Sequence, residues 1–396
     1  MIYTILKAYL KIVLRIYCRA LWINNKPVLN ERGPILFAVN HPNSFLDAVL
    51  IGIQFRDPVW FLARGDVFKK KWHANALFRL KVLPVFRLSE GKENLHRNDG
   101  TFDQCRELFA KKDNVLIFSE GACENEWKLR ALKKGTARLA FASWADPRIG
   151  QQLKVIPVTI NYDCFKSFHK SAILTFHEPI TKDQFDCKEL NGEFITKFNQ
   201  QLKQSLTAST LVINQHQKEE LNFLQFIQNN QQLFSSEKQQ KIAKDPRSFF
   251  EATQEGLLIS AAAKITWHKC ALTFKHTLKH AFYAIVLLIP ALLGMIVNGP
   301  FYYITRTFVR SKFYNSVFYD SVIAAAVVLF FPIYAIAFFI ALYFALGIWP
   351  ALVFLLFIGD LGFAVIRFRE NWHAVKSFFL LTPSERAAIK KFISGI

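Results

Sequence analysis

The first half of the chain alternates short apolar runs with longer stretches of helical spacing. Uninterrupted apolar runs bounded by polar residues predict buried strands, and apolar residues recurring every three or four positions predict helices. The predicted strands are Ile35–Val39, Val59–Leu62, Val82–Phe86, Asn114–Phe118, Leu153–Ile160 and Ala172–Phe176. The predicted helices are Phe45–Ile53, Asp66–Leu80, Thr101–Lys111 and Lys134–Ala145. This alternation predicts an α/β domain with a mostly parallel sheet and flanking helices.

The pattern changes towards the C-terminus, where two long stretches carry no charged residue. These stretches are Ala281–Thr305 and Ser321–Gly359. The first is long enough to cross a bilayer once, and the second is long enough to cross it twice with a turn near Gly347. We therefore predict C-terminal transmembrane helices, in two or three spans. Burial in a large soluble core is the alternative, and apolar runs of this length are rare there.

The N-terminus has the pattern of an amphipathic helix. Basic residues recur every four positions at Lys7, Lys11, Arg15 and Arg19, and most residues between them are apolar. Such a stripe predicts a helix that lies in a membrane interface with its basic side chains towards the headgroups. A signal peptide would instead have an uninterrupted apolar centre. A helix packed on the α/β domain with a solvated basic face is the alternative.

Composition narrows the function classes. The chain is 52% hydrophobic and carries a formal net charge of +20. A membrane protein that faces anionic lipid, or one that acts on phosphate-bearing substrates, accounts for both features. Soluble nucleic-acid binders are basic but lack long charge-free apolar runs, so we expect no nucleic-acid partner. The 6 cysteines show no CxxC spacing, which predicts no zinc site or disulfide framework and indicates a cytosol-facing domain.

A histidine and a carboxylate follow the first predicted strand, at His41 and Asp47. Asn43 or Ser44 can cap a helix that begins near Phe45, which places Asp47 in its first turn and His41 before it. A carboxylate beside a histidine fixes the tautomer, so the other ring nitrogen can accept a proton. Six residues correspond to about 600° along a helix, so the pair can form only if His41 precedes the helix. A turn histidine bonded to a neighbour is the alternative.

Further polar residues stand at the ends of other predicted elements. Arg87 ends one strand, Glu120 and Gly121 follow another, and Lys133 and Lys134 open a helix. A guanidinium offers a planar fork for phosphate, a glycine turn lets the backbone approach a ligand, and a helix N-terminus favours anions. Each residue also has a structural alternative, namely a surface arginine, a turn carboxylate or a solvated lysine pair.

Taken in order, these segments resemble the motifs of the glycerophospholipid acyltransferases, which include glycerol-3-phosphate and 1-acylglycerol-3-phosphate acyltransferases. The family pattern is an Asn-His block with a following Asp, a strand ending in Phe-Ile-Asp-Arg or similar, Phe-Pro-Glu-Gly-Thr-Arg, and Val-Ile-Pro-Val. The matching residues here are Asn40-His41 with Asp47, Phe86-Arg87, Phe118-Ser119-Glu120-Gly121, Leu132-Lys133-Lys134-Gly135 and Val155-Ile156-Pro157-Val158. The resemblance covers about residues 30–180.

The resemblance implies a role for each matching site residue. His41 would be the general base and Asp47 its partner, while Arg87 and the Glu120–Gly121 turn would bind the glycerol phosphate of the acceptor. We assign Lys133 and Lys134 to the same anion site. A thioester is already activated, so attack by an alcohol needs no serine or cysteine nucleophile. Neither a metal nor a cofactor is implied beyond the acyl donor, acyl-CoA or acyl carrier protein.

The spacing of the first motif departs from the bacterial pattern. Five residues separate His41 from Asp47, where the bacterial block has four. Five also occurs in fungal-type glycerol-3-phosphate acyltransferases, which resemble this chain in having membrane spans after the catalytic block. The spacing therefore favours glycerol-3-phosphate as the acceptor, with 1-acylglycerol-3-phosphate as the next candidate.

The third motif also departs from the family. Ser119 replaces its proline, and Ala122-Cys123 replaces Thr-Arg, so a phosphate-binding arginine is missing. Arg130 or Lys128 are candidate substitutes.

We therefore expect a membrane-bound O-acyltransferase whose catalytic domain faces the cytoplasm and whose partners are membrane lipids, the acyl donor and a glycerol-phosphate acceptor. A different lysolipid or amino-acid lipid acceptor, or a non-catalytic lipid-binding protein of the same fold, are alternatives. A transporter would have ionisable residues inside its spans, whereas Asp320 and Asp360 only border them. The expected domains are an interfacial helix (1–25), a catalytic domain (26–210), a helical linker region (211–278), the transmembrane region (279–366) and a basic helical tail (367–396).

Overall fold

The computed structural model describes residues 2–87, 97–166, 168–186, 189–212 and 270–395, with the single residues Asn222, Phe226, Asn230, Ala261 and Lys264. The chain divides into two compact units. The first comprises Met1–Phe165 and Lys170–Val212, and the second comprises Lys166–His169 and Ile213–Ile396. Most of the helical linker region expected over residues 211–278 lies outside the described residues.

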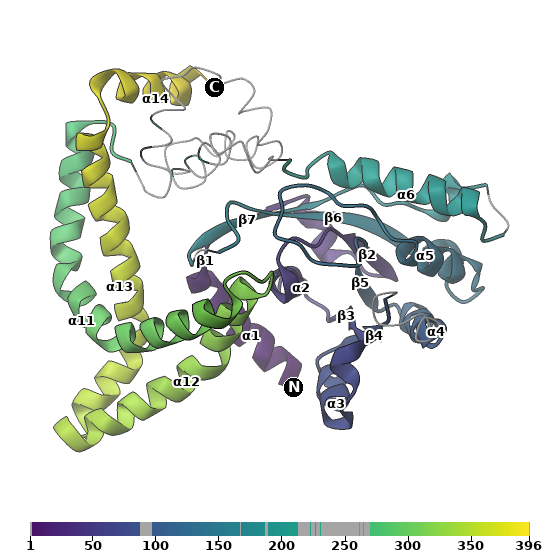
Figure 1. Cartoon of the computed structure of the whole chain (residues 1–396), viewed down its shortest axis with the longest axis horizontal. Helices are drawn as coiled ribbons and strands as arrows, with labels where there is room; N and C mark the ends of the chain where they lie inside the picture. Colours follow the sequence, from purple (N-terminus) through teal and green to yellow (C-terminus); the bar gives the residue numbers. More distant parts are fainter. Residues whose placement is uncertain are drawn as a thin grey trace. The chain divides into compact units, whose positions relative to one another are not determined.

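The first unit is built on a seven-stranded sheet with the order β1-β7-β6-β2-β5-β3-β4 (Figure 1). Every neighbouring pair is parallel except β6 and β7, which are antiparallel. The mostly parallel α/β architecture predicted from the sequence is therefore confirmed. The strands are β1 (Cys18–Asn24), β2 (Ile35–Val39), β3 (Val59–Arg64), β4 (Val82–Val85), β5 (Asn114–Phe118), β6 (Lys154–Tyr162) and β7 (Lys170–Phe176).

Helices connect and cover these strands. They are α1 (Ile2–Tyr17), α2 (Ser44–Gly52), α3 (Lys71–Arg79), α4 (Arg97–Ala110), α5 (Gly135–Ala145) and α6 (Gly192–Thr207). Short 3-10 turns lie at Lys26–Asn30, Gly65–Phe68, Gly150–Gln152 and Lys182–Gln184. The single helix predicted over Asp66–Leu80 is wrong in its first part, because the 3-10 turn comes first and α3 begins only at Lys71. Gly65 packs closely on the Phe86 ring, so that a Cβ there would lie 2.3 Å from Cε1, and this contact fixes the start of the turn.

The N-terminal helix is shorter than predicted. It ends at Tyr17, and the following residues form β1, which pairs in parallel with β7. Pairing with this open sheet edge overrides the local helical pattern. Arg19 therefore leaves the expected basic stripe, and Lys7 turns towards the domain, where its Nζ donates to the carbonyl oxygens of Phe55 and Arg56. The interfacial role of this segment stays a prediction.

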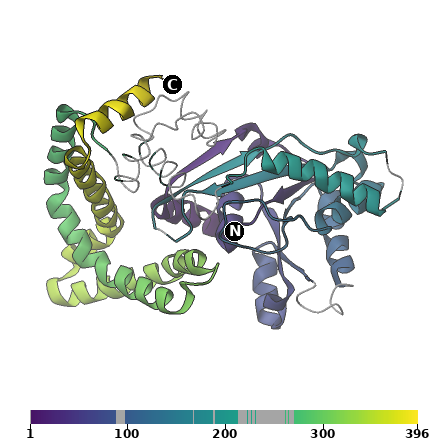
Figure 2. The same cartoon turned by 45° about the horizontal axis from the view of Figure 1, so that its top comes forward.

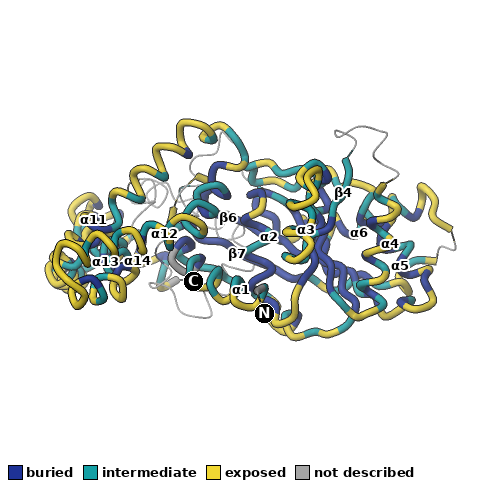
Figure 3. Tube along the Cα trace, turned by 90° about the horizontal axis from the view of Figure 1, so that it is seen from below, coloured by how far each residue is buried: buried dark blue, intermediate teal, exposed yellow. Residues whose placement is uncertain are grey.

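The core lies on both faces of β2, because side chains of a strand alternate between faces. Leu36 and Ala38 belong to an apolar cluster with residues of α4, α5 and α6, and α6 lies along this side of the sheet (Figure 2). Phe37 points to the opposite face, where its ring centroid lies 4.6 Å from that of Phe55 and 6.3 Å from that of Phe176. All residues of β2 are buried, and Figure 3 shows that most of the sheet is buried as well. The loop after β2 is therefore anchored to a strand that is packed on both faces.

The carboxyl ends of β2 and β5 lie side by side at one edge of the sheet, and β6 continues past them to Tyr162. Val39 pairs with Phe118 on one flank and with Val158 on the other. The backbone N–H of Ser119 continues this ladder with a bond of 2.9 Å to the Val39 carbonyl. In parallel sheets, functional loops gather at this edge.

The second unit contains three helices that are long and apolar enough to cross a membrane, within the described ranges. They are α11 (Phe274–Phe313), α12 (Tyr319–Leu346) and α13 (Ile348–Leu380), followed by α14 (Pro383–Gly395). Gly347, with φ +86°, forms the turn between α12 and α13 where the sequence predicted one. Large apolar side chains on these helices are exposed, such as Phe344 at 81% and Leu356 at 75%. Many positions along the helices carry the colour of exposed residues in Figure 3. An apolar exterior of this kind is compatible with membrane insertion.

Small and polar residues join α11 to α13. Gly294 lies so close to the Leu361 carbonyl that a Cβ there would approach the oxygen to 2.2 Å. Asn298 Nδ2 donates to the Ile358 carbonyl at 3.1 Å. Close backbone approach at glycine and hydrogen bonds between helices are typical of helix packing in membranes.

Candidate active site

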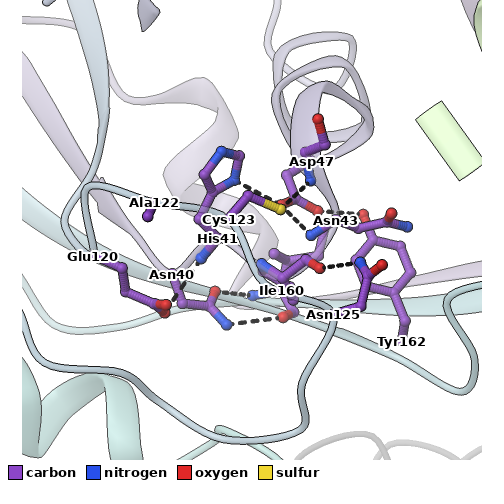
Figure 4. A network of polar contacts seen from close by, with 12 residues as sticks. Asn40, His41, Asn43, Asp47, Glu120, Ala122, Cys123, Asn125, Ile160 and Tyr162 are labelled. Carbon is purple, nitrogen blue, oxygen red and sulfur yellow. Dashed lines mark hydrogen bonds and ion pairs between the residues drawn. The ribbon is translucent and has the colours of Figure 1, made fainter. Parts of the chain in front are cut away.

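The histidine and aspartate of the first motif form a direct pair. His41 lies on the turn between β2 and α2, and its Nδ1 is 2.9 Å from Oδ2 of Asp47 in the first turn of α2 (Figure 4). The side chain of Asp47 is fully buried, while that of His41 is 17% exposed. His41 precedes the helix and Asp47 lies on it, which is the arrangement that the spacing requires. The exposed part of the ring can meet a substrate, and the carboxylate cannot.

Two more donors hold the Asp47 carboxylate. The backbone N–H of Asn43 donates to Oδ2 at 2.8 Å, and the hydroxyl of Tyr162, at the end of β6, donates to Oδ1 at 2.7 Å. An ionised carboxylate only accepts hydrogen bonds, so His41 donates from Nδ1 in this network. The other ring nitrogen, Nε2, is then the one that can accept a proton.

The start of α2 differs from the sequence prediction. Neither Asn43 nor Ser44 caps the helix with its side chain. Asp47 instead accepts the backbone N–H of Asn43, so the carboxylate that orients the histidine also satisfies the helix N-terminus. Ser44 has φ +52°, in the left-handed region, and its N–H donates to Sγ of Cys123 at 2.8 Å.

The loop after β5 packs against the loop after β2. The His41 ring stacks on Phe118 with centroids 3.7 Å apart and an angle of 13° between the planes. Asn125 Nδ2 donates to the Pro42 carbonyl at 2.8 Å, and the N–H of Glu124 donates to the His41 carbonyl at 3.4 Å. The position of the imidazole is therefore fixed by both loops.

Glu120 points towards the backbone of the histidine. Its Oε1 accepts the N–H of His41 at 3.3 Å (Figure 4). Its carboxylate also accepts a hydrogen bond from the backbone of Arg130. Only 4% of the residue is exposed. Burial raises the pKa of Glu120 to about 7, against the opposing effects of the His41 N–H and the Arg130 charge. Glu120 thus ties the histidine turn to the segment around Arg130.

Gly121 forms the turn after Glu120. Its φ of +68° lies in the left-handed region, and a Cβ there would lie 2.8 Å from Cγ of Lys133. Two guanidinium groups reach this turn, because Arg87 Nη1 donates to the Gly121 carbonyl at 3.0 Å and Arg130 Nη1 donates to the Ala122 carbonyl at 3.3 Å. The structure therefore gathers cationic side chains around one glycine turn. Lys134, the last predicted site residue, is exposed at the N-cap of α5.

The residues 21–161, which contain this arrangement, match the family model described as Acyltransferase. The match confirms the predicted resemblance to acyltransferases for these residues. A solved structure similar to this chain is that of the 1-acyl-sn-glycerophosphate (LPA) acyltransferase PlsC from Thermotoga maritima. The identity is 16%, the match covers 52% of this chain and 78% of that one, and the TM-score is 0.37. No curated protein matches this chain in sequence.

Cys123 lies within the acyltransferase site, at the position where the family pattern has arginine. Burial raises the pKa of its thiol above the usual value, and the negative charge of Asp47 raises it further. Because the thiolate is the reactive form of cysteine, a thiol with a raised pKa is a poor nucleophile at neutral pH. Its described role is structural, as an acceptor for the Ser44 N–H.

Sequence reasoning missed Tyr162, and it quoted Asn40 in the first motif without giving it a role. Tyr162 lies two residues beyond the predicted end of its strand, and with the strand extended it would have fallen at the same sheet edge as His41. Asn40 bonds β6 through both ends of its amide, donating to the Ile160 carbonyl at 3.0 Å and accepting the Ile160 N–H at 2.8 Å. Its position next to a predicted strand end was the available signal.

We expect Glu120→Gln to change how stability depends on pH. Because burial raises the Glu120 pKa from 4.5 to about 7, the folded protein binds more protons than the unfolded chain between these values. The free energy of unfolding of the wild type should therefore fall as the pH rises through this range, by about 3 kcal/mol at most. Glutamine does not titrate, so the wild type should lose thermal stability relative to the variant between pH 5 and pH 8. A difference in Tm that stays constant over this range would contradict the raised pKa.

Proposed function

We propose that the acyltransferase domain moves a fatty acyl group from acyl-CoA or acyl carrier protein to a hydroxyl of glycerol-3-phosphate or 1-acylglycerol-3-phosphate. The observation that carries this proposal is the buried pairing of Asp47 with His41, at 2.9 Å, beside a glycine turn that two arginines contact. The pair supplies a base for an alcohol, and the turn supplies positive charge for a phosphate.

In the proposed reaction, Nε2 of His41 takes the proton of the acceptor hydroxyl as its oxygen attacks the thioester carbonyl. The Asp47 carboxylate, 2.9 Å from Nδ1, stabilises the imidazolium that forms. The carbon–sulfur bond then breaks, and Nε2 returns the proton to the leaving thiolate. General-base catalysis is typically worth about 10²–10⁴-fold in rate, and positioning of the two substrates supplies much of the rest.

The acceptor phosphate would bind at the Gly121 turn between Arg87 and Arg130. Arg130 takes the place of the arginine that the third motif lacks, because its guanidinium bonds the Ala122 carbonyl next to Cys123. The Lys133 side chain, which lies against Gly121, adds a third cation. Lys134 contributes charge at the start of α5. These four basic residues support the proposal that the acceptor is a phosphorylated glycerol.

The three apolar helices of the second unit would hold the enzyme in a membrane, with the acyltransferase domain on the cytoplasmic side. This placement would supply the lipid acceptor or receive the lipid product directly. In this proposal the domains keep the boundaries that the sequence predicts, at residues 25, 210, 278 and 366.

The function can be tested with membranes that carry the full chain and a labelled acyl donor. Glycerol-3-phosphate is added in one reaction and 1-acylglycerol-3-phosphate in a second, while glycerol and a monoacylglycerol serve as phosphate-free controls. We expect label in lysophosphatidate or phosphatidate and none in the control products. Transfer to a phosphate-free acceptor alone would overturn the proposal.

We expect Arg130→Gln to weaken use of the phosphorylated acceptor. Loss of one charge-assisted contact corresponds to a fall in kcat/KM of roughly 10–100-fold, and most of it should appear as a higher KM for the acceptor. The matched control is Lys128→Gln, since Lys128 is 58% exposed and paired with Glu126 at 3.0 Å. The control should behave as the wild type. A rise in the KM for the acyl donor instead of the acceptor would contradict the assignment.

A further inference from the structure

Helix α3 of the acyltransferase domain buries none of its residues. At 100° per residue, its exposed positions fall within one arc of about 160°. Two large aromatic side chains lie in this arc, Trp72 at 66% exposure and Phe78 at 56%. The exposed positions are Lys71, Trp72, Asn75, Ala76, Phe78 and Arg79. Large aromatic side chains left exposed among basic and polar residues indicate an interaction surface.

The segment around α3 is strongly basic. Residues 64–81 contain six lysine or arginine residues and one carboxylate, Asp66. That carboxylate is already paired with Arg64, whose Nε lies 3.1 Å from its Oδ1. Three of the cations are consecutive and exposed, at Lys69, Lys70 and Lys71. The surface therefore presents positive charge beside exposed aromatic rings.

The position of α3 relates this surface to the active site. The connection from β3 to β4 leaves at the carboxyl edge of the sheet and returns at the opposite end, because the two strands are parallel. The 3-10 turn before α3 packs on Phe86, and the next residue, Arg87, bonds the Gly121 carbonyl. The lysine run thus lies at the edge of the sheet that carries the site. Figures 1 and 2 show α3 at the periphery beside β3 and β4.

We propose that α3, with the lysine run before it, docks the acyltransferase domain on an anionic lipid bilayer. Trp72 and Phe78 would enter the headgroup region while the lysines bind lipid phosphates, as in helices that lie in a membrane interface. The excess of cations favours an anionic surface. A bilayer is favoured over an acidic protein because the same chain carries three helices able to cross a membrane. Docking would turn the active-site edge towards the lipid. The inference does not rest on the acyl-transfer chemistry.

The test uses the full chain in lipid nanodiscs and the fluorescence of Trp72. The Trp72 signal is the difference between the wild type and Trp72→Phe. We expect brominated phosphatidylcholine to quench this signal roughly twofold or more in discs that also contain phosphatidylglycerol. The triple variant Lys69→Gln, Lys70→Gln, Lys71→Gln should lose most of this quenching. Trp349→Phe serves as a control for the quencher, since Trp349 is 76% exposed on α13.

Two outcomes would overturn the proposal. Quenching of Trp72 by aqueous iodide but not by brominated lipid would show that α3 faces water. Quenching by neither agent would show that protein covers the helix, whether a second copy or another part of the chain. The fluorescence needs no turnover, so the result can be read even if the proposed acyl transfer fails its own assay.

Discussion

His41→Ala should lower the turnover of acyl transfer by roughly 10³–10⁴-fold while leaving the protein folded. The imidazole is the group at the site that the carboxylate orients, and alanine leaves no nitrogen to take the proton of the acceptor hydroxyl. The fold should survive because the His41 side chain is partly exposed and its backbone bond to Glu120 does not depend on the ring. The decisive measurement is single-turnover transfer from a labelled acyl donor, with thermal unfolding measured on the same samples.

A second histidine provides the matched control. His177 follows β7, which β6 separates from β2 in the sheet, and its backbone N–H bonds the Pro157 carbonyl of β6. Its Nε2 lies 2.9 Å from the Ser209 hydroxyl, and burial lowers its pKa to about 4. His177→Gln can reduce stability, but its turnover per folded molecule should match the wild type. Near-normal turnover of His41→Ala would remove the general base from the proposal.

Asp47→Asn should have the second largest effect, a fall in kcat of roughly 10²–10⁴-fold with little change in the acceptor KM. The carboxylate accepts hydrogen bonds from His41, Asn43 and Tyr162. An amide has only one oxygen, so either Tyr162, or both His41 and Asn43, which share Oδ2, must face an NH₂ group. If the NH₂ group faces His41, the ring adopts the other tautomer, with its proton on Nε2, and the base is lost. Steady-state kinetics over a range of pH can measure the loss.

Tyr162→Phe separates orientation from packing in this network. The phenylalanine ring fills the same space and removes only the hydroxyl bond to Asp47, while His41 keeps its carboxylate. The cost of one such bond, about 1 kcal/mol, corresponds to a loss of about fivefold. If this conservative variant lost as much activity as Asp47→Asn, the aspartate would act through the structure of the loop and not through its charge.

Local patterns were sufficient to predict the central strands. β2 and β5 have the predicted bounds, because both are uninterrupted apolar runs buried in the middle of a parallel sheet. The strand Cys18–Asn24 was missed, because its residues suit a helix equally well and its partner, β7, lies about 150 residues later in the chain. The break between Phe68 and α3 was missed for a similar reason, since it depends on the contact of Gly65 with Phe86.

The sequence predicted those contacts of the site that join residues close together in the chain. His41 and Asp47 could be paired from their spacing around a strand end and a helix start. The hydroxyl of Tyr162 could not be placed, because its contact with Asp47 depends on the order of the strands, which puts β6 next to β2. The Ser44 N–H bond to Cys123 depends on a left-handed serine, and no pattern of residue types indicates that conformation.

The protonated thiol of Cys123 has a consequence for the order of events in the proposed reaction. Since burial raises the Cys123 pKa and His41 is assigned to proton transfer, neither side chain would carry the acyl group in the proposed reaction. The acyl group would then pass directly from the donor to the acceptor. Donor and acceptor would then have to occupy the site together. With the donor bound alone, the enzyme would leave the thioester intact until an acceptor binds.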